Sequence, residues 1–115
     1  MMSSPVEQSP PRLLTPGIQE QTPAYFCRLL WHYIDALPME GVAVSHELHF
    51  FIRQEACHCR LACVQDGPRY HHRWDMQLFS ATDLLPTEII VYTVGERQIM
   101  CLPEELPALQ AHYGD

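Results

Sequence analysis

The stretch GVAVSHELHFFIRQEACHCRLACVQDGPRYHHRWDMQLF, residues 41–79, decides the fold because much of it alternates between apolar and polar side chains. Alternate positions of its first part form one largely apolar face: Val42, Val44, His46, Leu48, Phe50 and Ile52. A period of two is typical of a strand with one buried face. Residues 57–65 and 69–79 predict two further strands, and Asp66-Gly67-Pro68 between them is a turn signal.

Two turns, Glu55-Ala56 and Asp66-Gly67, predict how these three strands pair. Together they place Cys59 between Ile52 and Trp74 on one face of the sheet. That face then stays apolar through all three strands, whereas a shift of one residue would turn it against the charged side. A longer first loop would preserve the register. The pattern therefore predicts a three-stranded antiparallel meander.

A helix is predicted immediately before the meander, in residues 22–38, TPAYFCRLLWHYIDALP. Thr22 suits the N-cap, Pro23 suits the first helical position, and Pro38 favours an end nearby. Large hydrophobic residues recur at helical spacing along one side: Phe26, Leu29, Leu30, Tyr33, Ile34 and Leu37. This amphipathic helix is therefore expected to pack one face on the core.

Two more elements follow the meander. Residues 88–103, EIIVYTVGERQIMCLP, predict a second hairpin that turns at Gly95-Glu96. Both faces of this hairpin are apolar, which predicts a central or well-covered position in the sheet. Residues 103–115 predict a short C-terminal helix, with Pro103 near its start and Pro107 as a point where it splits.

The predicted fold class is therefore α+β. It comprises an N-terminal amphipathic helix, an antiparallel sheet of about five strands (the meander plus the hairpin) and a short C-terminal helix. Residues 1–22 are rich in Pro, Ser and Gln, a composition that disfavours a packed structure. We predict that they form a disordered leader and that residues 23–115 form a single α+β domain.

The net charge of −7 argues against two classes of partner. Nucleic acids are bound mainly through Lys and Arg, and anionic membrane surfaces attract basic segments. The sequence shows no signal peptide and no apolar run of the ~20 residues that a membrane span needs. Five cysteines are an odd number, so we expect free thiols and a cytoplasmic protein.

The segment ACHCRLAC, residues 56–63, raises the alternative of a zinc site. In a strand, Cys57 and Cys59 lie ~6.7 Å apart and Cys63 lies ~13 Å beyond Cys59, so one ion cannot bind all three. A site across two strands would use Cys59, Cys63 and His72. Free cysteine also behaves as a small buried hydrophobic residue, and we predict that role. No cofactor is therefore predicted, with zinc as the alternative.

The outer face of the meander gathers basic side chains of an acidic chain. The predicted registers arrange them in three rows: Arg53, His58 and Asp75, then Arg60 and Arg73, then His49 and His71. Arg60 directly opposite Arg73 is unfavourable unless an anion or Asp75 relieves the repulsion. The functional hypothesis is a binding site for an anion or an acidic partner, strengthened at mildly acidic pH, where histidine gains charge. The simpler interpretation, which the sequence favours, is a solvated face or one covered by the C-terminal elements.

No catalytic motif is present, such as a glycine-rich phosphate loop or GxSxG. The leading prediction is a small non-catalytic protein-binding or regulatory domain, whose partner is another protein or a second copy in a homodimer. Two alternatives stay open. Stoichiometric metal would favour a zinc-stabilised module, and a ligand-sized pocket lined by His49, His58 and His71 would favour a small enzyme with a His/Arg site on the outer sheet face.

Overall fold

The computed structural model describes residues 11–78 and 84–113, and these residues form both strands and helices. The strands are β1 (Arg12–Leu14), β2 (Glu47–Glu55), β3 (His58–Asp66), β4 (Arg69–Gln77), β5 (Glu88–Val94) and β6 (Arg97–Cys101). The helical elements are α1 (Pro16–Gln21), α2 (Ala24–Met39), the 3-10 turn η2 (Pro103–Glu105) and α3 (Leu106–Tyr113). No helix in the described residues combines the length and apolar character that crossing a membrane requires.

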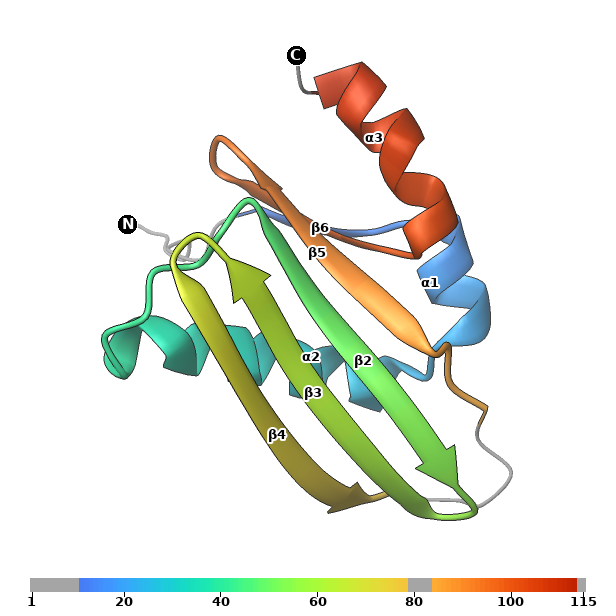
Figure 1. Cartoon of the computed structure of the whole chain (residues 1–115). Helices are drawn as coiled ribbons and strands as arrows, with labels where there is room; N and C mark the ends of the chain where they lie inside the picture. Colours follow the sequence, from blue (N-terminus) through green and yellow to red (C-terminus); the bar gives the residue numbers. More distant parts are fainter. Residues whose placement is uncertain (1–10, 79–83, 114–115) are drawn as a thin grey trace, which may run out of the picture.

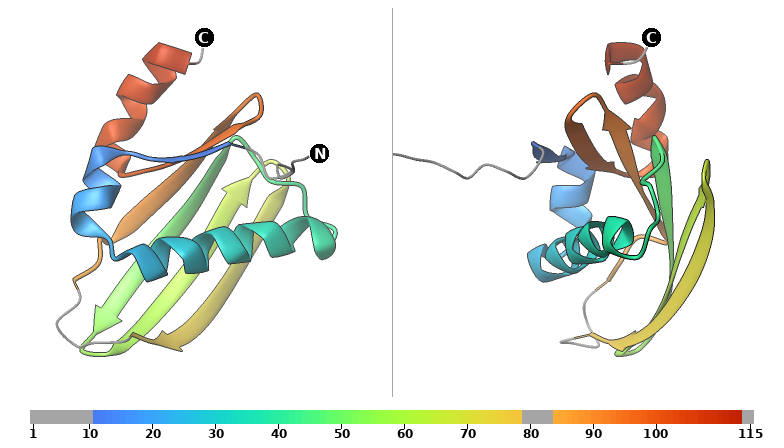
Figure 2. Two further views of the ribbon diagram at one scale, coloured as in Figure 1. Left: turned by 180° about the vertical axis from the view of Figure 1, so that it is seen from behind. Right: turned by 90° about the vertical axis from the view of Figure 1, so that its left-hand side faces the viewer.

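The strands form one mixed sheet in the order β1-β6-β5-β2-β3-β4 (Figure 1). α2 crosses one face of the sheet, which we call the inner face (Figure 2). The core lies between this helix and the sheet, and includes Phe26 and Leu30 of α2 with Phe50, Leu61 and Ile89 of the strands. α3 lies next to β5 on the opposite side, the outer face, where its Gln110 donates a hydrogen bond to Glu47 at the start of β2, and it leaves the rest of β2 with β3 and β4 open (Figure 1).

The α+β class and the short C-terminal helix are confirmed, but the sheet differs from the predicted one. It has six strands rather than about five, and it is mixed because β1 pairs in parallel with β6, with Leu13 opposite Ile99. Residues 11–22, predicted to belong to a disordered leader, form β1 and α1 instead. The rest of the predicted leader, residues 1–10, lies outside the described residues.

Glu105 holds the proline-rich residues 11–22 against the rest of the domain through hydrogen bonds. Its carboxylate accepts hydrogen bonds from Thr15 Oγ1 at 2.5 Å, the Gly17 backbone at 3.0 Å and the Leu102 backbone at 2.9 Å. Burial by itself would raise the pKa of Glu105, but these hydrogen bonds outweigh it and lower the pKa below its usual value. A Cβ at Gly17 would lie 2.7 Å from Leu102 Cδ1 and 2.8 Å from Glu105 Oε2, so a larger residue there would displace these side chains.

α2 corresponds to the predicted amphipathic helix, although it is the second helix of the chain and its ends differ. Pro23 is its N-cap, because the extended ψ of 146° at this residue delays the first helical turn. Thr22, the predicted N-cap, closes α1 instead. Pro38 lies inside the last turn, and the helix ends one residue later at Met39.

Both turns of the meander lie one residue later than predicted, which shifts both registers by two residues. The first turn is Ala56-Cys57, so Ile52 lies opposite Leu61 rather than Cys59. The second turn is Gly67-Pro68. A shift of two residues returns every side chain to the same face, so the hydrophobic pattern cannot detect it. The predicted inner face is therefore right, although the predicted pairs are not.

The second hairpin turns at Gly95-Glu96, as predicted. Both of its faces are buried: Val91 belongs to the core under α2, and Ile90 is buried on the side of α3. Its strand β5 pairs with β2 near the centre of the sheet. Pro107 does not split the C-terminal helix, because it lies in the first turn of α3, where no backbone donor is lost.

Candidate functional site

The open part of the outer face carries all seven residues that the sequence predicts as a binding site: Arg53, His58, Arg60, Arg73, His49, His71 and Asp75. All are exposed except His49, which is half-buried. They share this face because alternate residues of a strand point to the same side. The rows that they form differ from the predicted rows.

The arginines have other neighbours than predicted. Arg60 lies opposite Asp75 on β4 and opposite Arg53 on β2, whereas Arg73 lies opposite Ala62. Arg60 Nε is 3.5 Å from Asp75 Oδ1, and both side chains are mostly exposed, so this ion pair contributes little to stability. The predicted opposition of Arg60 and Arg73 is therefore replaced by an opposition of Arg53 and Arg60, which is unfavourable for the same reason.

We define the cationic patch as Arg53, Arg60 and Arg73 together with Phe51. These residues line an open cavity of about 240 Å³ to which Ala62 also contributes. Phe51 is 43% exposed. Within the described part of the chain, neither Arg53 nor Arg73 forms an ion pair. The patch thus presents guanidinium groups beside an uncovered aromatic ring.

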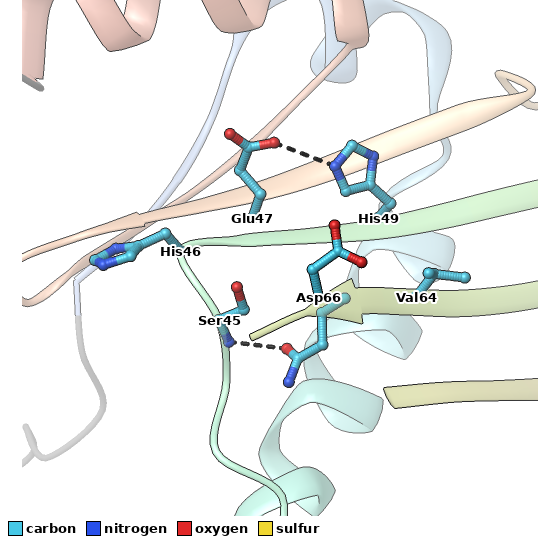
Figure 3. Close-up of a pocket in the computed structure, with 7 residues that line it drawn as sticks. Ser45, His46, Glu47, His49, Val64 and Asp66 are labelled. Carbon is cyan, nitrogen blue, oxygen red and sulfur yellow. Dashed lines mark hydrogen bonds and ion pairs between the residues drawn. The ribbon is translucent and has the colours of Figure 1, made fainter. Parts of the chain in front are cut away.

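A second cavity, of about 270 Å³, lies towards the other end of the open face (Figure 3). His49 is central to its polar contacts, because Nδ1 is 2.7 Å from Glu88 Oε2 and Nε2 is 3.2 Å from Glu47 Oε1. Asp66 lines the same cavity from the end of β3. Glu47 and Asp66 thus bring carboxylates to this cavity, whereas Glu88 reaches His49 from its position opposite Phe51, beside the cationic patch.

Sequence reasoning misses Glu47 and Glu88 as partners of His49. The period of two already places Glu47 on the same face as His49, so this contact has a local sequence signal. Glu88 has none, because it belongs to β5. Only the pairing of β5 with β2, which sets Glu88 opposite Phe51, brings its carboxylate to the histidine.

Gln65 fixes the chain around the second cavity. It is 2% exposed, and its amide accepts a hydrogen bond from the Ser45 backbone at 2.8 Å. The same amide donates to the carbonyl oxygens of Ala43 at 2.7 Å and Pro68 at 2.9 Å. A buried amide with satisfied partners thus ties the segment before β2 to the β3–β4 turn.

The predicted histidines do not share one pocket. His49 lines the cavity described above, whereas His58 lines a separate cavity of about 100 Å³ beside Arg53 and Glu55. His58 stands ~20 Å along β3 from Val64, the residue opposite His49. The common pocket that would favour a histidine-based enzyme is therefore not formed by His49 and His58.

Cys59 and Cys63, two of the alternative zinc ligands, are buried in the core under α2. β3 runs unbroken through both, which keeps them ~13 Å apart, and the third alternative ligand, His72, lies opposite Cys63. The described residues contain no group of three or more His, Cys, Asp or Glu that could hold a metal ion. Burial raises the pKa of Cys63 to about 12 and also raises the pKa of Cys59, so both thiols are protonated at neutral pH in the chain without metal.

Comparison with known proteins identifies the fold and the family. The chain is similar to the crystal structure of a protein of unknown function from Enterococcus faecalis, with a TM-score of 0.72. The match covers 86% of this chain and 92% of that chain, and the 23% sequence identity limits it to a likeness of fold. No curated protein matches the chain. Residues 11–105 match the model of the family described as "Staphylococcal protein of unknown function (DUF960)", and the chain belongs to this family.

Proposed function

We propose that the chain is a small protein-binding domain that holds an acidic segment of a partner protein on the cationic patch. One observation carries this proposal. Arg53, Arg60 and Arg73 line one cavity together with the exposed ring of Phe51, on the sheet face opposite α2 in a chain whose net charge is −7. Like charges set side by side repel, so an anion between them would stabilise the arrangement.

The chemistry of the patch favours a carboxylate next to an apolar side chain. A guanidinium group donates two parallel hydrogen bonds to one carboxylate, and Arg53 and Arg73 have no described ion-pair partner of their own. Phe51 and Ala62 offer apolar contacts between the arginines. An extended segment that alternates acidic and apolar residues would satisfy both halves of the patch.

The shape of the surface supports binding of a protein segment better than catalysis. Sites for small molecules usually bury most of the ligand in a cleft. The cationic patch lies instead on an open strand surface, and its cavity is shared among side chains of β2, β3 and β4. His49 and His58, which the enzyme alternative would combine, line separate cavities.

Fluorescence anisotropy with two labelled peptides tests the proposal. One peptide alternates glutamate with valine, and the other has glutamine in place of glutamate. We expect only the acidic peptide to bind, and we expect its affinity to fall with added salt, which screens exposed charges. The double variant Arg60→Glu, Arg73→Glu should weaken its binding by at least about tenfold.

A matched variant separates the patch from the net charge. Arg28→Glu combined with Arg97→Glu changes the charge equally, but these residues lie on α2 and β6. It should retain binding of the acidic peptide. Equal binding of the two peptides, or an equal loss in both double variants with the fold intact by circular dichroism, would refute the proposed function.

A further inference from the structure

β4 is an exposed edge of the sheet. It is nine residues long and stands at the end of the strand order, so β3 is the one described strand that pairs with it (Figure 1). A long edge strand offers unpaired backbone groups to another chain, and proteins usually shorten or interrupt such edges. The opposite edge follows this rule, since β1 has three residues. β4 does not follow it and contains no proline.

An apolar groove lies beside this edge on the inner face. Its cavity of about 460 Å³ is lined by residues of α2 and β4 and their surroundings, which include Leu29, Tyr33, Met76 and Leu78. Trp74 extends the surface along β4, with its ring stacked on that of Tyr33 at a centroid distance of 4.2 Å. Trp74 and Met76 are half-buried in the single chain. The edge and the groove therefore form one continuous surface.

We propose that a second copy of the chain occupies this surface, with β4 paired against β4 in antiparallel orientation across a two-fold axis. Two residues that lie opposite each other in antiparallel strands point to the same face of the sheet. The two-fold axis therefore passes between the two copies of a single β4 residue. An axis at Arg73 or at Asp75 would oppose like charges, and one at His72 would oppose His71 to Arg73. An axis at Trp74 places each Arg73 opposite Asp75 of the second copy, which forms two ion pairs.

The same axis suits the inner face. The two Trp74 side chains would meet at the axis. Tyr70 of each copy would lie opposite Leu78 of the other, at the apolar groove, and His72 would lie opposite Met76. Apolar surface that is half-buried in the single chain would thus be removed from water on both copies. This removal is the main source of association free energy.

The charge of β4 also suits contact between two acidic chains. Its charged residues are arginines and histidines apart from Asp75, so the copies would meet through strands that carry one acidic residue each. Arg73 belongs both to this edge and to the cationic patch. Asp75 lies outside the patch as defined, so a change at Asp75 tests the dimer separately from the proposed function.

Sedimentation velocity of the full chain tests the dimer. We expect a dimer at micromolar concentration. Asp75→Arg, which opposes arginine to Arg73, should raise the dimer dissociation constant about tenfold. The charge swap Arg73→Asp, Asp75→Arg should restore the dissociation constant of the original chain. Glu96→Arg, in the β5–β6 turn, changes the net charge as Asp75→Arg does and should have no effect.

Three results would overturn the inference. A monomer at every concentration would exclude the dimer. A dimer that Asp75→Arg leaves unchanged would place the interface elsewhere. A charge swap that folds but fails to restore the dimer would exclude the axis at Trp74.

Discussion

Glu105 joins segments that lie 90 residues apart, because its carboxylate accepts a hydrogen bond from Thr15 in the turn before α1. Burial opposes ionisation, but the hydrogen bonds from Leu102, Thr15 and Gly17 prevail and lower the pKa of Glu105. A carboxyl group with a depressed folded-state pKa stabilises the fold above its unfolded-state pKa. This contribution is lost as the pH falls through the folded-state pKa.

We therefore expect Glu105→Gln to lower the free energy of unfolding by about 2 kcal/mol at neutral pH. The difference from the original chain should shrink once the pH falls below ~4.3, the ordinary pKa of glutamate. Urea unfolding followed by circular dichroism measures both quantities. Glu20→Gln, at an exposed position of α1, is the control. A difference that stays constant from neutral to strongly acidic pH would contradict this role.

The cysteines differ in exposure at the residue scale. Cys57 is half-buried in the β2–β3 turn, whereas Cys27, Cys59, Cys63 and Cys101 are buried. Burial raises the pKa of Cys63 to about 12, and burial together with nearby carboxylates raises the pKa of Cys101 to about 12. Because the thiolate is the reactive form, these thiols should be inert in the folded chain.

We expect a thiol-specific disulfide reagent to modify Cys57 rapidly and the other cysteines only after unfolding. Cys57→Ser should remove the rapid phase, and Cys63→Ser should leave it unchanged. Absorbance of the released thiol gives the rates, and peptide mass spectrometry locates the modified residue. Rapid modification of Cys59 or Cys63 would contradict their place in the core.

At the scale of elements, β2 and β3 show which features of a strand are encoded locally. The alternation of Leu48, Phe50 and Ile52 predicts the strand and its buried face correctly. It cannot fix the register, because pairs two residues apart have the same pattern. β1 and α1 are missed for another reason: the prolines around them disfavour regular structure, and distant contacts hold them, from β6 to β1 and from Glu105 to the start of α1.

Gln65 gives a prediction at this scale, since one side chain connects two loops. Gln65→Leu would leave the Ser45 amide and the carbonyls of Ala43 and Pro68 without their partner. We expect the free energy of unfolding to fall by about 2 kcal/mol, measured by urea unfolding. Gln21→Leu, at an exposed position of α1, should have little effect. Equal effects of the two substitutions would show that the hydrogen bonds of Gln65 are dispensable.

At the scale of the whole molecule, charge and coverage together distinguish the open face. The chain has 14 acidic residues and 7 arginines, and three of those arginines lie in the cationic patch. Their common face is predictable, because it follows from the period of two alone. The contact of Glu88 with His49 is not predictable, and neither is the position of α3 over β5, because both depend on the order of strands in the sheet.

The binding of an acidic segment at the cationic patch is the central claim, and an NMR titration of the isotope-labelled full chain tests it most directly. The ligand is the peptide that alternates glutamate with valine. The account predicts the largest shift changes at the backbone amides of Phe51 and Ala62 and at the side chains of Arg53 and Arg73, with α2 unchanged. Changes confined to α2, or spread evenly over the chain, would contradict it.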